Sequence, residues 1–366
     1  MKKFAVGVLV LLAALAAYLA FWPVPVQPVA WVAPAAPGYQ GAHAANTQLA
    51  GLTLIPLPPG EAGPEHVLLG RDGKLYAAVA SGRILRMHAD GSAAEVYADT
   101  GGRVLGFDFD AADRLIAADA VKGLLAVDTD RRVSVLADRV DGDPIRYADA
   151  VVVARSGKIY FSDASGRFAP ADWGGTFDAA VLDIVEQRAT GRILEYDPAT
   201  KKTRVVVRGL SFPNGAALSA DEQHLYVAET GRYRIWKVAV DATDLDAGSG
   251  SAQAQVLLDN LPGYPDNLLR GDAGRIWVGF TGPRNPVVDG MAGKPWLRAL
   301  TLRLPRALWP LPVPYGHVFA FDDSGRIVAD LQDPSGSYPQ TTGVTETAER
   351  LYVQNLHLGV LGWKPR

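Results

Sequence analysis

The chain has 366 residues, 36 basic and 39 acidic side chains, a formal net charge of −3 and no cysteine. The near balance of charge gives no footprint for nucleic acid, and the lack of cysteine excludes disulfides, thiolate metal sites and a cysteine nucleophile. With 48% hydrophobic and 20% charged residues, the chain is too apolar for disorder and long enough to bury a large core.

Residues 1–22 predict a signal-anchor transmembrane helix. Two lysines precede an uncharged apolar run from Phe4 to Trp22, close to the length that crosses a bilayer as a helix. The segment 16–20, Ala-Ala-Tyr-Leu-Ala, is an imperfect cleavage site, so a removed signal peptide is the alternative. After Lys3 the next basic residue is Arg71, and the positive-inside bias therefore predicts a cytoplasmic amino terminus. We expect a membrane-anchored body on the periplasmic or extracytoplasmic side, secreted if the segment is cleaved.

Residues 23–50 are rich in Pro and Ala and predict a linker, and residues 51–366 carry a sixfold repeat. Each copy has an apolar stretch, a turn rich in Asp and Gly, and a Leu-Tyr-like pair that opens a strand. The alternation of apolar residues between turns predicts antiparallel strands. We therefore predict an all-β fold, a six-bladed β-propeller preceded by one N-terminal transmembrane helix, because a parallel β-helix needs shorter repeats. The pair-opening residues are Leu75, Leu115, Ile159, Leu225, Ile276 and Leu351.

Two insertions lengthen the repeat, near residues 169–190 and 286–314. The first predicts a short helix whose apolar face contains Ala179, Val181, Leu182 and Val185. The second mixes tryptophans and leucines with basic residues. Such a segment would lie on a membrane surface, cover a pocket as a lid, or pack on the propeller rim. Its marker residues are Trp296, Trp309, Lys294, Arg298, Arg303 and Arg306.

One position of the repeat carries oxygen-bearing side chains. Counting ten residues back from each pair-opening residue, or eleven in the fourth copy because of its longer turn, gives positions that converge on the central channel. Three carboxylates there cannot all stay ionised without a counter-charge, and no Lys or Arg occupies these positions. Carboxylate and amide oxygens suit Ca²⁺, or another divalent cation, whereas the absence of His and Cys argues against zinc. Ordinary turn residues are the alternative. The positions are Glu65, Leu105, Asp149, Asn214, Asp266 and Thr341, and the predicted ligands are Glu65, Asp149, Asn214, Asp266 and the adjacent Asn267.

A second recurring position lies four residues after the pair-opening residue. It holds Asp119, Asp163 and Glu229, for which the common phase predicts hydrogen bonds between blades.

The sequence resembles the strictosidine synthase-like family of calcium-dependent six-bladed propellers, which includes adipocyte plasma membrane-associated protein. It is more distantly similar to gluconolactonase and paraoxonase. The match covers about residues 60–363. It is carried by GPE at 63–65, GRVLG at 102–106, PIRYAD at 144–149, IYFSDAS at 159–165, FPNG at 212–215, AETGRYRI at 228–235 and PDN at 265–267.

The resemblance implies calcium ligands at Glu65, Asn214, Asp266 and Asn267, with Asp149 standing where the family usually has Asn. The glutamate that acts as base in strictosidine synthase falls at Thr341 or Thr342. Neither can serve as that base, so we do not expect strictosidine synthase activity. The paraoxonase histidine beside the metal falls at Leu105.

The leading hypothesis is an arylesterase- or lactonase-like hydrolase in which Ca²⁺ polarises the carbonyl and activates water. Asp266 is the first candidate to accept a proton, Asp149 the second and His357 the third. The alternative is a non-enzymatic, membrane-tethered binding propeller with structural calcium. Aromatic residues in the loops predict an apolar or aromatic ester or lactone as substrate. They are Tyr147, Phe168, Trp173, Phe212, Tyr264, Phe280 and Tyr338.

Overall fold

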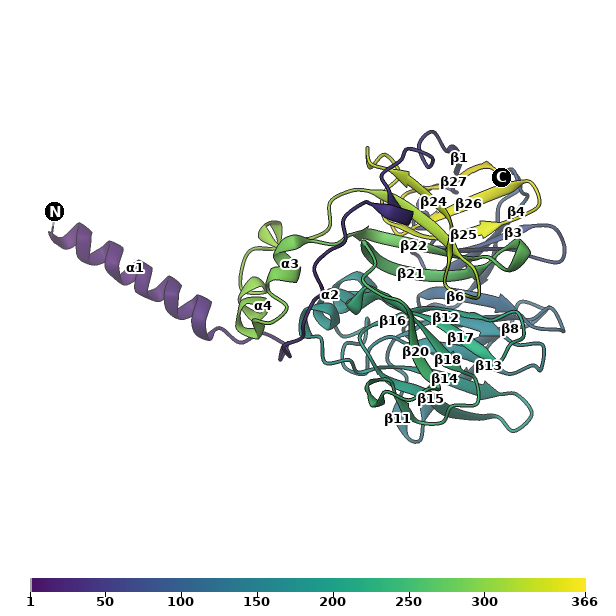
Figure 1. Ribbon diagram of the computed structural model, residues 1–366, viewed down its shortest axis with the longest axis horizontal. Helices are drawn as coiled ribbons and strands as arrows, with labels where there is room; N and C mark the ends of the chain where they lie inside the picture. Colours follow the sequence, from purple (N-terminus) through teal and green to yellow (C-terminus); the bar gives the residue numbers. More distant parts are fainter. Residues whose placement is uncertain (1) are drawn as a thin grey trace.

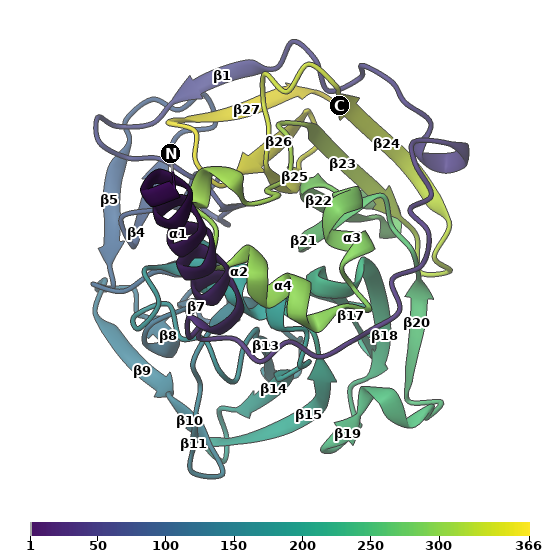
Figure 2. The same ribbon diagram turned by 90° about the vertical axis from the view of Figure 1, so that its left-hand side faces the viewer.

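The computed structural model describes residues 2–366, and within this range six antiparallel blades form a ring (Figures 1 and 2). The predicted six-bladed propeller is confirmed, and each pair-opening residue lies at the start of the second strand of its blade. Blade 1 contains β2 (His66–Leu69), β3 (Leu75–Ala78), β4 (Arg83–Met87) and β5 (Glu95–Asp99). Blade 2 contains β6 (Val104–Phe109), β7 (Leu115–Asp119), β8 (Gly123–Val127) and β9 (Val133–Ala137). Blade 3 contains β12 (Ala148–Val153), β13 (Ile159–Asp163), β14 (Gly191–Asp197), β15 (Lys202–Leu210) and the short parallel β19 (Leu245–Asp246).

The remaining blades follow the same order. Blade 4 contains β16 (Pro213–Leu218), β17 (His224–Glu229), β18 (Arg234–Ala239) and β20 (Ala254–Leu258). Blade 5 contains β21 (Gly263–Arg270), β22 (Ile276–Pro283), β23 (Gly316–Phe321) and β24 (Ile327–Asp333). Blade 6 contains β25 (Thr341–Glu346), β26 (Arg350–Asn355), β27 (Val360–Pro365) and β1 (Thr53–Pro56). A separate hairpin pairs β10 (Arg139–Val140) with β11 (Asp143–Pro144).

The ring closes by pairing the two ends of the propeller. Strand β1 runs antiparallel to β27, with Ile55 opposite Leu361. Both residues are buried, in one cluster with Val67 and Leu75 of blade 1. The first strand therefore covers the outer edge of the last blade, which would otherwise expose unpaired backbone groups.

Glycines let the inner strands approach one another closely around the axis. A Cβ on Gly106 would lie 2.8 Å from the carbonyl oxygen of Asp149, and one on Gly215 would lie 2.4 Å from that of Asp266. Both distances are below van der Waals contact. The strand segments of β12 and β21 that contain Asp149 and Asp266 can therefore lie this near their neighbours only because Gly106 and Gly215 lack a side chain.

The two insertions cover one end of the central channel (Figure 2). The first forms α2 (Thr176–Glu186), and the second forms α3 (Pro286–Gly290), α4 (Pro295–Thr301) and a 3-10 turn, η5 (Arg306–Leu308). The apolar helix α1 (Lys2–Phe21) has a mean hydropathy of 2.6 and is long enough to cross a membrane or act as a signal sequence. It extends away from the face that carries α2, α3 and α4 (Figure 1).

A polar cluster attaches the segment after α1 to blade 5. His43, in the 3-10 turn η1 (Gly41–His43), lies 2.6 Å from the carboxylate of Asp330, and His317 of β23 lies 2.8 Å from the same oxygen. These three residues are grouped closely enough to hold a metal ion. Each imidazole bonds the shared carboxylate, and this network holds residues 41–43 against the propeller. Nδ1 of His317 is buried without a hydrogen-bond partner among residues 2–366.

Candidate functional site

The structure brings four of the predicted ligands together around one cavity. Glu65 precedes β2, while Asp149, Asn214 and Asp266 lie near the starts of β12, β16 and β21, the innermost strands of their blades. All four are at least 94% buried, and all line a cavity of about 540 Å³ at the centre of the ring. Repetition of one strand position around the axis thus places side chains that are far apart in sequence on a common floor.

Leu105, Asn267, Thr341 and Thr342, which lie at or next to this repeat position, do not line the cavity. Leu105 is buried in an apolar cluster. Asn267 turns its amide to the backbone, donating to the carbonyl of Glu65 at 2.9 Å. The hydroxyls of Thr341 and Thr342 are also engaged with backbone carbonyls, that of Thr342 with the carbonyl of Glu65 at 2.7 Å. Asn267 and Thr342 therefore fix the Glu65 backbone, and the position of the strictosidine synthase glutamate carries no acidic group.

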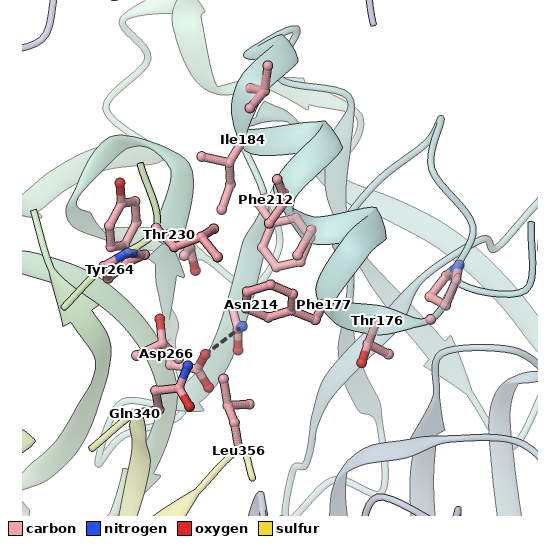
Figure 3. A pocket seen from close by; sticks show the side chains of 18 of the residues that line it. Thr176, Phe177, Ile184, Phe212, Asn214, Thr230, Tyr264, Asp266, Gln340 and Leu356 are labelled. Carbon is pink, nitrogen blue, oxygen red and sulfur yellow. Dashed lines mark hydrogen bonds between the residues drawn. The ribbon is translucent and has the colours of Figure 1, made fainter. Parts of the chain in front are cut away.

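Asn214 and Asp266 form a direct pair on the cavity floor (Figure 3). The Asn214 amide nitrogen donates to Oδ2 of Asp266 at 3.2 Å, and Oδ1 of Asp266 accepts from the backbone N–H of Asn267 at 3.0 Å. Oδ1 of Asn214 is buried and has no hydrogen-bond partner among residues 2–366. A buried acceptor without a donor is unfavourable, and it marks a place where a cation or a ligand donor fits.

Arg103 supplies a positive charge that the sequence prediction missed. Its guanidinium donates to the Glu65 carboxylate and, at 2.7 Å, to the carbonyl of Val79. No Lys or Arg occupies the ring positions themselves, and a basic side chain that reaches the floor from outside them was therefore not considered in the sequence prediction. Arg103 lies two residues before Leu105 and reaches the floor by its length. Arg103 is part of the GRVLG motif at 102–106, so this motif was the sequence feature that could have identified it.

One arginine does not neutralise three buried carboxyl groups. Burial raises the pKa of Glu65, and nearby Arg103 opposes the rise. The pKa of Asp149 is raised well above its usual value, first by burial and then by the charge of Glu65. That of Asp266 is raised in the same way, with both other carboxylates contributing. The site therefore favours added positive charge, as protons or as a cation.

The donor set fits a hard divalent cation. Glu65, Asp149 and Asp266 offer carboxylate oxygens, and Asn214 offers the unpartnered amide oxygen. Oxygen donors of this kind suit Ca²⁺.

The carboxylates at the second recurring position bond to the backbone of the segments that precede the inner strands. Asp119 accepts from the backbone N–H of Arg103 at 3.0 Å, and Asp163 accepts from that of Tyr147 at 2.9 Å. Glu229 accepts from the backbone N–H of Ser211 at 2.8 Å. Asp119 of blade 2 also accepts at 2.7 Å from the hydroxyl of Thr100, which directly follows β5 of blade 1. The predicted bonds thus occur at the segments that join one blade to the next, and the three buried carboxylates position the residues just before each inner strand.

Apolar side chains from both insertions form the walls and roof of the cavity. Helix α2 contributes Phe177, Val181 and Ile184, and the second insertion contributes Leu302 and Trp309. Val181 and Val185 of the predicted apolar face line the cavity, whereas Ala179 and Leu182 pack inward. Among the predicted aromatic residues, Tyr147, Phe212 and Tyr264 line the cavity. Phe280 and Tyr338 are packed instead in the core of blades 5 and 6.

His357 lies at the mouth of the cavity. It is exposed, lines the cavity together with Val121 and Ala171, and meets the ring of Phe177 edge-on at 5.9 Å. Partial desolvation, with a contribution from Arg103, lowers its pKa. A neutral imidazole at this place can contact a ligand entering the cavity.

Sequence comparisons support one family. The strictosidine synthase profile matches residues 149–243, and the N-terminal profile of strictosidine synthase-like proteins matches residues 41–87. Strictosidine synthase-like 7 of Arabidopsis thaliana is 30% identical over 285 residues, which cover 76% of this chain and 72% of that protein. Adipocyte plasma membrane-associated protein of Rattus norvegicus is 32% identical, over 68% of this chain and 65% of the relative. Strictosidine synthase-like 13 of Arabidopsis thaliana is 34% identical over 64% of this chain. The match spans 57% of the length of that relative.

Solved structures agree on the fold. A gluconolactonase of Xanthomonas campestris superposes with a TM-score of 0.61 at 20% identity, covering 93% of this chain and 98% of the other. Regucalcin of Agrobacterium tumefaciens, described as a calcium-binding protein, gives 0.50 at 17% identity, over 84% and 95% of the two chains. At these identities the likeness extends to the propeller fold alone. The sequence matches show that the chain belongs to the strictosidine synthase-like family.

Proposed function

We propose that this chain is a Ca²⁺-dependent hydrolase of esters or lactones, tethered by α1 with its propeller on the extracytoplasmic side of the membrane. The observation that carries the proposal is the cavity floor, where three buried carboxyls and an unpartnered amide oxygen lie beneath apolar walls. The fold of the Xanthomonas gluconolactonase is consistent with lactone chemistry.

Glu65, Asp149, Asn214 and Asp266 would hold the ion. When bound, Ca²⁺ supplies a Lewis acid that polarises the substrate carbonyl and stabilises charge on its oxygen. Asp266 would accept the proton from water. Burial and the charges of Glu65 and Asp149 raise its pKa, which makes the carboxylate a stronger base. Its two oxygens are oriented by Asn214 and the Asn267 backbone.

The cavity walls select the substrate class. Phe177, Phe212 and Ile184 face the space above Asn214 and Asp266 (Figure 3). They would bind an apolar or aromatic acyl or alcohol group, and the roof would limit access of bulk water to the floor.

The test is hydrolysis of aryl acetates and a panel of lactones by the purified full-length chain in detergent. We expect activity that EGTA abolishes and Ca²⁺ restores. Asp266→Asn should lower kcat by about 10²–10⁴-fold. Asp99 is an exposed carboxylate of β5, and the control variant Asp99→Asn should leave turnover unchanged. Equal turnover by Asp266→Asn and the parent chain would refute the proposed chemistry. Loss of thermal stability on chelation without any hydrolysis would favour the binding propeller with structural calcium.

A further inference from the structure

The second insertion presents an apolar and basic surface on the outer side of the cavity roof. Val287, Trp296, Leu308 and Val313 are each between 59% and 66% exposed, and none of them lines the cavity. Of the four basic side chains between residues 286 and 314, Arg298 is buried, while Lys294 and Arg306 are exposed and Arg303 is partly exposed. Arg306 pairs with Asp178 of α2, and the one acidic side chain of the segment is Asp289. Exposed large apolar residues together with an excess of basic charge are typical of a surface that contacts lipid headgroups and acyl chains.

The end of the apolar helix is fixed to this same insertion. Arg303 donates to the carbonyl of Trp22, directly after α1, at 2.7 Å. Further along, the backbone N–H of Trp31 donates to the carbonyl of Ala292 at 3.2 Å. Arg298, buried beneath the insertion, donates to the carbonyls of Val29 and, at 2.8 Å, Val185 of α2. The segment after α1 is thus bound across the roof and is not a free spacer.

This attachment fixes where the membrane lies. A helix of 20 residues rises about 30 Å, the thickness of the hydrocarbon core, so Phe21 and Trp22 would lie at the lipid–water interface. Because Arg303 contacts Trp22, the second insertion lies at the same level. Helix α1 departs from the face that carries α2, α3 and α4 (Figure 1). Exposed Val121 and His357 line the same cavity as residues of α2 and of the second insertion.

We propose that the outer face of the second insertion rests on the bilayer that α1 crosses, and that the cavity takes an amphiphilic ester or lactone directly from the lipid surface. The proposal rests on the proposed function for the chemistry of the substrate, but not for the contact with lipid. Basic side chains beside Trp296 and Leu308 favour anionic headgroups. The apolar cavity walls would let the acyl chain of such a substrate remain in apolar surroundings between the bilayer and the cavity floor.

Because the chain has no cysteine, a single introduced cysteine gives a unique labelling site for measuring the contact. The full-length chain is reconstituted in nanodiscs containing anionic lipid, with a nitroxide on Val287→Cys or on Leu308→Cys. Leu69→Cys is the control, since Leu69 is 42% exposed and lies at the end of β2 away from Glu65. We expect the labels at 287 and 308 to collide more with O₂ and less with a water-soluble nickel complex than the label at 69.

Equal collision rates at the three positions overturn the proposal. Protection of 287 and 308 from both O₂ and nickel also overturns it, because a protein partner or a second copy would then cover the surface. A second arm uses Leu308→Ser, which should lower turnover of a vesicle-embedded ester by about tenfold, the effect of losing one buried leucine, and leave a water-soluble ester unaffected. If the chain hydrolyses nothing, the proposed function fails while the collision rates still test the membrane contact.

Discussion

Replacing Arg103 by Met tests whether its guanidinium and a bound cation neutralise the same buried carboxylates. The Arg103 side chain is 13% exposed and that of its partner Glu65 is 8% exposed. Removing one member of such a buried pair leaves an uncompensated carboxylate and costs about 3–5 kcal/mol. For a chain of 366 residues, an unfolding entropy that scales with length gives about 1.3 °C per kcal/mol. In EGTA we therefore expect the melting temperature to fall by about 4–7 °C.

Saturating Ca²⁺ should reverse most of this loss, because the ion supplies the missing positive charge. If about 1 kcal/mol remains from lost packing of the Arg103 stem, the thermodynamic cycle requires Ca²⁺ to bind the variant about 3 kcal/mol more tightly, roughly 100-fold in Kd. Thermal unfolding with and without EGTA measures one side of the cycle. Titration against a chromophoric chelator measures the other, and the two must agree.

The matched control is Arg192→Met. Arg192 is also 13% exposed, and it pairs with the buried Asp163 at 3.0 Å and with Asp143 at 2.9 Å. Neither carboxylate lines the cavity. The control variant should lose similar stability whether or not Ca²⁺ is present. If Arg103→Met behaves like Arg192→Met, and its Ca²⁺ affinity equals that of the parent chain, Arg103 is only a structural residue and the shared-charge reasoning is wrong.

Two further outcomes follow from burial and close approach. Burial raises the pKa of Asp183 in α2 from 3.8 to about 7. The protonated side chain therefore stabilises the folded state below pH 3.8, and this contribution to the free energy of unfolding is lost as the pH rises through 7. The loss amounts to up to about 4 kcal/mol. Urea unfolding should show Asp183→Asn gaining stability over the parent chain between pH 4 and 8, and a constant difference would contradict this pKa. Gly215→Ala places a Cβ 2.3 Å from the backbone nitrogen of Leu268, so calorimetry should show a lower melting temperature and weaker Ca²⁺ binding. The control Gly293→Ala should change neither quantity, because its Cβ meets nothing within 4 Å.

The sequence predicted the propeller and the floor because both depend on repetition. A fixed distance between a turn and a strand places Glu65, Asp149, Asn214 and Asp266 at equivalent points of their blades, and rotation about one axis brings equivalent points together. Arg103 departs from this rule. Its backbone lies outside the repeat position, and only the reach and direction of a long side chain bring its charge to Glu65.

The roof could not be predicted for a related reason. Insertions have no counterpart in other blades, so the repeat gives no position for them. Phe177 and Trp309, far apart in the chain, both line the same cavity, and no period relates them. The contact between Arg303 and the end of α1 likewise depends on how two irregular segments lie on the finished ring.

Closure of the ring through β1 and β27 sets the order in which the site can be completed. The floor begins at Glu65, shortly after β1, and its backbone is held by Thr342 of the last blade. The cavity has no wall between the first and last blades until Val360–Pro365 pairs with β1. If the propeller is exported behind α1 as proposed, a partly translocated chain carries the floor residues without the cavity, and only complete translocation lets the ring close.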